Sequence, residues 1–199
     1  MEPRAYIDFL NQIEKLKCNT RHSWTSSGRR ESVAEHSWRL AVMAMLCADE
    51  YPSLDIGRVV SMCLLHDLGE AVTGDIPAFW KTEENERDER AAIGQLLSCL
   101  PSGIRQEWSA LFDEMEARQT PEARLYKSLD NLETLISHNE AALSTWLPRE
   151  HSENLTYGDE NCAWSDWTVR LKEEIRSDSL KKLSEEGEAF SDKDEGETI

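Results

Sequence analysis

Residues 59–70 read VVSMCLLHDLGE and join an apolar run to two side chains that can bind a metal ion. The run from Val59 to Leu65 predicts a buried helix, because apolar residues dominate it at helical spacing. His66 and Asp67 follow where that helix approaches its end. A buried carboxylate is costly without a partner, so Asp67 needs either a cation or several hydrogen-bond donors. A metal ion bound by both side chains would meet that need.

Histidine is scarce in this chain, with five residues in all. His36 stands near the start of another largely apolar helix, from which its imidazole could reach the same point as His66. A histidine at a helix N-terminus more often bonds a backbone carbonyl, and a single His-Asp pair is common, so neither signal identifies a metal site alone. A divalent ion held by two imidazoles also needs one or two carboxylates. Asp130 and Glu133 both flank an apolar stripe, and spacing does not choose between them.

Apolar residues recur at helical spacing along most of the chain, which predicts an all-α fold of about seven helices. The expected helices begin at or near Pro3, Ser32, Asp55, Glu83, Ser102, Pro121 and Ser165. Ser32 and Glu35 have the spacing of a capping box. The helix from Asp55 is expected to end near Gly69 or at Thr73-Gly74, and residues 20–30 are expected to form a loop.

The length of 199 residues fits one ordinary domain with a sizeable core. We expect that domain to cover residues 1–183, with the last helix ending near Ser184. Residues 184–199 contain seven acids against one lysine and have no apolar period. They are therefore expected to form an acidic, disordered tail.

Charge and composition exclude several function classes. The chain has 39 acidic and 22 basic residues and a net charge of −17, which argues against a protein that coats nucleic acid or a membrane surface. Its longest apolar run, Leu40 to Ala48, has nine residues, far fewer than the roughly 20 that span a bilayer. The N-terminus shows no signal-peptide pattern. The five cysteines include no close Cys-x-x-Cys pair and are expected to be small buried hydrophobes of a cytoplasmic protein.

Several short segments together carry a resemblance to a known family. They are Arg21, ESVAEH at 31–36, HDLGE at 66–70, TGDIP at 73–77 and KSLD at 127–130. In order and kind these segments resemble the HD-domain metal-dependent phosphohydrolases, and most closely their 5′-deoxynucleotidase branch. The resemblance covers roughly residues 5–140. It implies an HD-domain helical bundle.

The resemblance also implies a metal site. Its ligands would be His36, His66, Asp67 and Asp130, which favours Asp130 over Glu133. Two nitrogen and two oxygen ligands suit Mn²⁺, Co²⁺, Fe²⁺ or Zn²⁺. Two-metal relatives add histidines between the His-Asp pair and the last aspartate, and this chain has none there. One divalent ion is therefore expected.

Further roles follow from the same resemblance. Glu70 and Asp75 match acidic residues used in catalysis, and Arg21 matches an arginine that binds the substrate phosphate. Lys81 corresponds to a lysine near the pocket in some relatives. A divalent ion would acidify a water molecule and polarise the phosphoryl oxygen, while Glu70 with Asp75 would handle the protons. The planar guanidinium of Arg21 suits a phosphate dianion.

One departure concerns recognition of the sugar. Deoxynucleotidase relatives place a tryptophan close after the phosphate arginine, whereas His22 follows Arg21 here and Trp24 is the nearest tryptophan. We expect Trp24 to take that role in substrate binding.

The predicted function is a metal-dependent phosphomonoesterase, a 5′-deoxynucleotidase that converts (deoxy)nucleoside 5′-monophosphates to nucleoside and phosphate. The alternatives are an HD phosphohydrolase acting on another small phosphate ester or a phosphonate, and a non-catalytic helical binding module with a structural metal. By analogy with relatives a homodimer is expected. Nucleic-acid polymers and membranes are not expected as partners.

Overall fold

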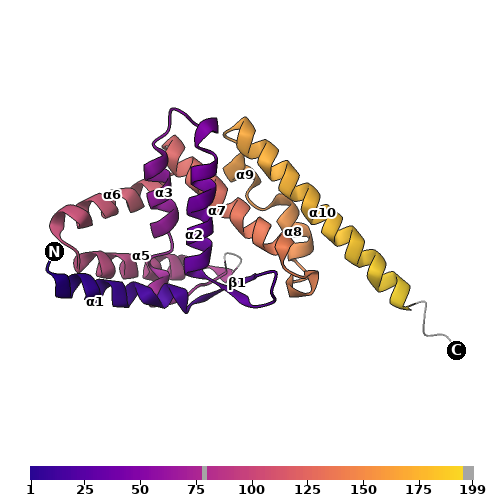
Figure 1. Ribbon diagram of the computed structural model, residues 1–199, viewed down its shortest axis with the longest axis horizontal. Helices are drawn as coiled ribbons and strands as arrows, with labels where there is room; N and C mark the ends of the chain where they lie inside the picture. The colour runs from indigo at the N-terminus through magenta and orange to yellow at the C-terminus, as the bar shows by residue number, and fades with distance from the viewer. Residues whose placement is uncertain (78–79, 195–199) are drawn as a thin grey trace. The chain divides into compact units, whose positions relative to one another are not determined.

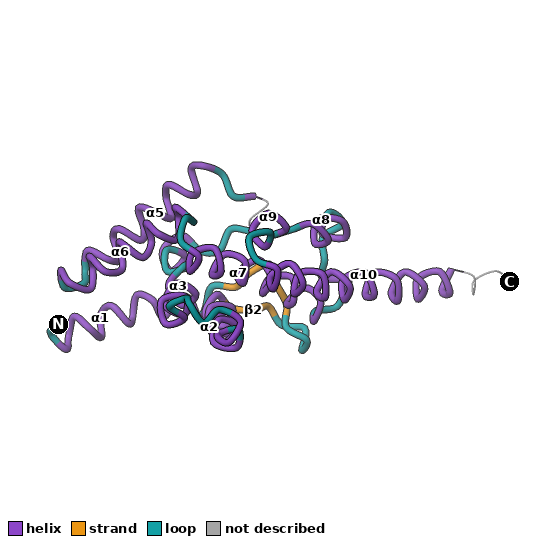
Figure 2. Tube along the Cα trace, turned by 90° about the horizontal axis from the view of Figure 1, so that it is seen from above, coloured by secondary structure: helices purple, strands orange, loops and turns teal. Residues whose placement is uncertain are grey.

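The computed structural model describes residues 1–77 and 80–194. Within them, seven helices of ten or more residues begin near the predicted positions (Figure 1). They are α1 (Pro3–Ile13), α2 (Val33–Leu46), α3 (Ile56–Leu65), α5 (Glu83–Ser98), α6 (Ser102–Ala117), α7 (Pro121–Glu140) and α10 (Asp166–Asp194). Three shorter helices are α4 (Glu70–Thr73), α8 (Glu150–Thr156) and α9 (Asp159–Cys162). Figure 2 shows how far helix predominates over strand, which confirms the all-α prediction.

The predicted loop over residues 20–30 is wrong at its two ends. Strands β1 (Thr20–Trp24) and β2 (Arg30–Ser32) pair as a two-stranded sheet. The residues between them form the turn, in which Thr25 N donates to Arg29 O over 2.8 Å and Gly28 has a φ of +83°. Strands this short carry too little alternation to be recognised from sequence.

The helix that carries the His-Asp pair ends earlier than expected. α3 stops at Leu65, and the chain continues in a tight turn in which Leu68 N donates to Leu65 O and Glu70 N to Asp67 O. Gly69 within this turn packs against α5, since a Cβ atom there would lie 2.9 Å from Glu89 Cγ and 3.0 Å from Glu89 O. The need for close approach explains glycine at this position.

The last helix is longer than expected. α10 continues to Asp194, ten residues beyond the predicted end at 184. Lys181 and Glu185, one turn apart, form an ion pair of 3.8 Å between Nζ and Oε1, of the kind that supports an exposed helix. The expected disordered tail is thus helical up to Asp194, and residues 195–199 lie outside the described residues.

Backbone contacts divide the chain into two compact units. The first comprises Met1–His22 and Arg30–Asp130, and the second comprises Ser23–Arg29 and Asn131–Ile199. A single domain over residues 1–183 stays a prediction.

The core of the first unit explains how its helices are held. Phe9 of α1 is buried with Leu68 and Ala71 and with Leu96 and Leu97 of α5. In the same unit α2 and α3 pack side by side, and both contribute fully buried side chains. The predicted capping box of α2 is present, with Ser32 N donating to the Glu35 carboxylate over 2.9 Å.

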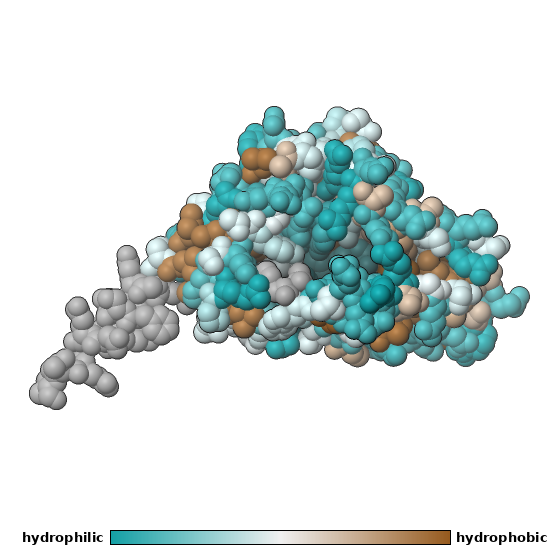
Figure 3. All heavy atoms as spheres, turned by 180° about the vertical axis from the view of Figure 1, so that it is seen from behind, coloured by the Kyte–Doolittle hydropathy of each residue, from teal (hydrophilic) through white to brown (hydrophobic). Residues whose placement is uncertain are grey.

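The surface agrees with the acidic composition. The face drawn in Figure 3 is mainly hydrophilic. In the described part of the chain, no helix combines the length and apolar character needed to cross a membrane. Cys47, Cys63 and Cys162 are buried as expected, whereas Cys18 and Cys99 are exposed, so the prediction is wrong for these two.

Candidate metal centre and active site

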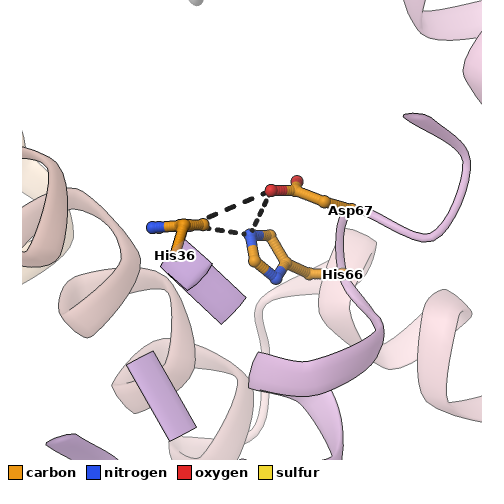
Figure 4. A group of neighbouring side chains, drawn as sticks. All are labelled: His36, His66 and Asp67. Atoms are coloured by element: carbon orange, nitrogen blue, oxygen red, sulfur yellow. Dashed lines mark hydrogen bonds and ion pairs between the residues drawn. The ribbon is translucent and has the colours of Figure 1, made fainter. Parts of the chain in front are cut away.

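The four predicted metal ligands lie together in the first unit. His36 comes from α2, His66 and Asp67 from the turn after α3, and Asp130 from α7. His36 Nε2 lies 3.2 Å from His66 Nε2 and 3.2 Å from Asp130 Oδ1. Asp67 Oδ2 lies 3.0 Å from His66 Nε2. Figure 4 shows His36, His66 and Asp67 pointing toward one another from these different segments.

The chemistry of this donor set fits a divalent cation. His66 Nδ1 lies 2.9 Å from the carbonyl oxygen of Cys63, so it is the donor nitrogen and Nε2 carries the lone pair. Two imidazole nitrogens that face each other at 3.2 Å, with a carboxylate oxygen near each, need a proton or a metal ion between them. The residues of this site could therefore hold a metal ion.

Neighbouring side chains keep the pKa of both aspartates low. Burial works against the charged form of Asp67, but His66 and His36 outweigh it and lower the pKa to about 2. Burial would also raise the pKa of Asp130, but the charge of Lys127 mainly outweighs this effect and holds the pKa well below its usual range. Lys127 Nζ donates to Asp130 Oδ2 over 2.6 Å, while Oδ1 is the oxygen near the histidines. The site thus presents two carboxylates ready to bind a cation.

Comparison with known proteins identifies the family. A family model described as HD domain matches residues 13–167. This chain belongs to the HD-domain family. The human protein named 5′-deoxynucleotidase HDDC2 is 36% identical over 141 residues, 69% of this chain and 68% of that protein. The Schizosaccharomyces pombe protein named 5′-deoxynucleotidase hdd1 is 30% identical over 139 residues, 66% of this chain and 69% of that protein.

A solved structure extends the likeness over most of the chain. It is described as a predicted metal-dependent phosphohydrolase from Magnetospirillum magnetotacticum MS-1. Its sequence is 34% identical, the match covers 91% of this chain and 92% of that chain, and the TM-score is 0.75. The fold of this HD domain is therefore that of a metal-dependent phosphohydrolase.

Glu70 lies buried beside the four clustered side chains of the HD domain. Burial, together with the charges of Asp67, Asp75 and Glu89, raises its pKa to about 10. Among the described residues its Oε2 atom is buried without a hydrogen-bond partner. Glu70 begins α4 rather than continuing α3, so the turn and not a helix repeat brings it near Asp67.

Arg21 and Asp75 occupy the same part of the HD domain. Arg21 Nη1 donates to Glu31 Oε2 over 3.1 Å, and both side chains are largely buried. Burial raises the pKa of Asp75, and the charge of Arg21 counteracts part of that rise. Glu31, which lies within the ESVAEH segment, therefore helps to hold Arg21, a function that its spacing from Arg21 did not reveal.

The remaining expected residues differ in their surroundings. Lys81 forms an ion pair with Glu89 of α5 and lines a cavity together with His66. Trp24 ends β1 in the second compact unit. Glu133, the alternative to Asp130, also belongs to that unit, where its Oε1 accepts a hydrogen bond from Ser137 over 3.2 Å.

Two residues near this centre escaped the sequence analysis. Lys127 was visible in the KSLD segment, and its position three residues before Asp130 on a helix could have indicated the ion pair. The ring of Tyr126 lies 5.5 Å from that of His66, and no sequence signal predicts that contact.

Proposed function

We propose that this HD-domain protein is a metal-dependent 5′-deoxynucleotidase, which hydrolyses (deoxy)nucleoside 5′-monophosphates to nucleoside and phosphate. The observation that supports it best is the convergence of two imidazoles and two carboxylates in a chain 36% identical to a protein of that name. A metal-dependent phosphohydrolase needs a metal ion near the phosphate, and this cluster is where one could bind.

The proposed ligands are His36, His66, Asp67 and Asp130, holding one divalent ion. Mixed nitrogen and oxygen donors favour Mn²⁺, Co²⁺, Fe²⁺ or Zn²⁺. When bound, such an ion polarises a phosphoryl oxygen and lowers the pKa of water. The carbonyl group of Cys63 lies 2.9 Å from His66 Nδ1 and orients the ring, so that Nε2 is the nitrogen that faces the proposed ion.

Arg21 is the proposed phosphate ligand supplied by the protein. Glu31 accepts a hydrogen bond from its Nη1 and orients the guanidinium, whose planar shape suits the oxygens of a phosphate dianion. Lys81, paired with Glu89, contributes a second positive charge near His66. In an acidic chain these cations make the site locally attractive to a small anion.

Glu70 and Asp75 are the proposed proton-handling groups. The Oε2 atom of Glu70 makes no hydrogen bond among the described residues and is therefore available to exchange a proton with the attacking water or the leaving 5′-oxygen. Asp75 is the second carboxyl, close enough to Arg21 for the two charges to interact. Trp24 is proposed to discriminate deoxyribose from ribose.

The test is phosphate release from deoxy- and ribonucleoside 5′-monophosphates by protein stripped with chelator and reloaded with Mn²⁺, Co²⁺, Fe²⁺ or Zn²⁺. We expect release to need the metal, to favour the deoxy forms and to be lost in Asp67→Ala. Asp49→Ala, which removes an exposed carboxylate, serves as the control. Equal release from both sugars would remove the deoxy preference. Absence of release from every nucleotide would refute the proposal and favour another phosphate ester or a binding module.

The expected partners and location also remain proposals. We propose that the enzyme acts on free nucleotides rather than on nucleic-acid polymers or at membranes, that it forms a homodimer and that it is cytoplasmic. Sedimentation equilibrium would decide the oligomeric state, and fractionation of cells the location.

A further inference from the structure

A side chain outside the four proposed ligands connects the segment of Arg21 to the segment of Glu70. Asn19 lies between the 3₁₀ helix η1 (Glu14–Lys17) and strand β1, two residues before Arg21. Its side-chain Nδ2 donates to the backbone oxygen of Glu70 over 2.5 Å. η1 also packs against α4, the short helix that Glu70 begins. The bond therefore joins two segments that carry proposed active-site groups.

The backbone of Asn19 is held on both sides. Its N–H group donates to Lys15 O over 2.8 Å, and its carbonyl oxygen accepts a hydrogen bond from Val33 N, at the start of α2, over 3.0 Å. Because these bonds already fix the residue, its side chain loses little further freedom when it bonds to Glu70. Asn19 thus links η1, α2 and α4.

The helix α4 is too short to hold its own start. It is a single turn of four residues, and its N-cap, Gly69, has no side chain that could cap it. One turn is not stable by itself, because nucleating a helix costs more than its few hydrogen bonds contribute. The backbone oxygen of Glu70 accepts from Gly74 N within that turn over 2.9 Å, and it also accepts from Asn19 Nδ2. The second bond ties the Glu70 backbone to a distant part of the chain.

The position of Asn19 relates Glu70 to Arg21. On an extended chain, side chains two residues apart lie on the same side, and here Thr20 is exposed whereas Asn19 and Arg21 are partly buried. Proton transfer needs donor and acceptor atoms about 2.6–3.2 Å apart, and a misplacement of about 1 Å can lower a rate by about 10²-fold. A group that fixes Glu70 against the segment of Arg21 therefore affects turnover.

We propose that Asn19 is a positioning residue, which sets the distance between a phosphate bound at Arg21 and the carboxyl group of Glu70. It acts through the backbone of Glu70 and is not one of the four proposed ligands. The inference rests on the proposed function and deepens it, because it assigns a residue that turnover requires and metal binding does not.

Three substitutions at Asn19 test the bond. Asn19→Leu removes the donor at similar size, Asn19→Asp replaces it with an acceptor that repels the Glu70 carbonyl oxygen, and Asn19→Gln keeps an amide donor on a longer side chain. Asn11, exposed on α1, supplies the matched controls Asn11→Leu and Asn11→Asp. Urea denaturation verifies that each variant is folded, and Asn19→Asp gives the same comparison if Asn19→Leu does not fold.

Hydrogen exchange detects the bond without turnover. Gly74 N donates to the same oxygen as Asn19, so this turn should open more often when Asn19 no longer holds it. We expect the amides of residues 70–74 to exchange about tenfold faster or more in Asn19→Leu than in Asn11→Leu, as measured by mass spectrometry on the metal-free protein. The dissociation constant for Mn²⁺, measured by calorimetry, should change by less than about twofold, because no proposed ligand is altered.

Turnover shows whether the bond acts through Glu70. We expect Asn19→Leu to lower kcat for a deoxynucleoside 5′-monophosphate by about tenfold or more with little change in KM, and Asn19→Gln to recover part of that loss. In a Glu70→Gln background, Asn19→Leu should change kcat by less than about twofold, because its effect requires the carboxyl group. Asn11→Leu should change neither kcat nor KM.

Several results would overturn the assignment while leaving the proposed function in place. An unchanged kcat or an unchanged exchange rate in Asn19→Leu would do so, and so would an equal loss of kcat with and without Glu70→Gln. A loss of Mn²⁺ affinity would place the damage at the metal centre and would also overturn it. If the wild type releases no phosphate from any nucleotide, the proposed function fails and the positioning role fails with it.

Discussion

At the scale of single residues, Lys127 controls how Asp130 is presented. Its ammonium group occupies Oδ2, which leaves Oδ1 for the histidines and for a cation. We predict that Lys127→Met raises the dissociation constant for Mn²⁺ by about tenfold or more, as expected when an outer partner of a ligand is lost. Lys127→Arg should retain most of the affinity. Isothermal titration calorimetry measures it, with Lys15→Met as an exposed control, and an unchanged affinity in Lys127→Met would disprove the role.

A substitution at Glu70 should lower turnover without preventing metal binding. The carboxyl is buried and is not one of the four proposed ligands. Glu70→Gln keeps its size but cannot exchange a proton, so we predict that kcat falls by about 10²-fold or more while Mn²⁺ still binds. Turnover and calorimetry on the same preparation provide the test. A variant that loses the metal along with its activity would show Glu70 to be a ligand instead.

At the scale of elements, the contact between the α3–α4 turn and α5 depends on Gly69. A Cβ atom would lie 2.9 Å from Glu89 Cγ and 3.0 Å from the Glu89 backbone oxygen, and the backbone cannot yield easily. Gly69→Ala should reduce the free energy of unfolding by about 1–3 kcal/mol, as measured by urea denaturation. Gly103→Ala, in open space on a helix, should instead increase it slightly. Equal effects of the two substitutions would contradict this account of the turn.

The link between α3 and α6 should depend on pH. Arg58 Nε donates to Glu114 Oε2 over 2.7 Å, and this bond lowers the pKa of Glu114 below its ordinary value of 4.5, with burial opposing it. The stabilisation is therefore present above pH 4.5 and is lost as the pH falls through the lower, folded-state value.

Arg58→Met tests that dependence. We predict that the free energy of unfolding falls by less than about 1 kcal/mol near pH 7, because Arg58 is partly exposed. The loss should become smaller as the pH falls below the ordinary pKa of a glutamate. Urea denaturation across this pH range measures both. In a Glu114→Gln background, Arg58→Met should have no pH-dependent effect on the free energy of unfolding. A loss of stability that grew toward acid pH in the Arg58→Met variant would contradict the prediction.

The same elements show which parts of the fold can be predicted from the sequence. The capping box of α2 and the seven longer helices follow from local patterns, because side-chain hydrogen bonds and apolar periodicity act within a few residues. The end of α3 and the strands β1 and β2 depend on tertiary contacts, such as the packing of Gly69 against Glu89, that no local pattern encodes.

At the scale of the whole molecule, the candidate site also combines features that the sequence predicts with features that depend on tertiary contacts. His66 and Asp67 are recognisable in sequence because a buried helix ends on them, and resemblance alone favoured Asp130 over Glu133. The ion pair of Lys127 with Asp130, the bond from Arg21 to Glu31 and the cavity beside His66 arise only when distant segments pack together. Spacing along the chain could not supply them.

The central claim is that one metal ion, held by the four clustered side chains, makes this HD domain a nucleotidase. The most direct measurement is the rate of phosphate release from a deoxynucleoside 5′-monophosphate as Mn²⁺ is added back to the stripped protein. The account predicts no release without metal and a linear rise that saturates at one equivalent in the wild type, with none in Asp67→Ala. Release that is independent of added metal, or that persists in Asp67→Ala, would contradict it.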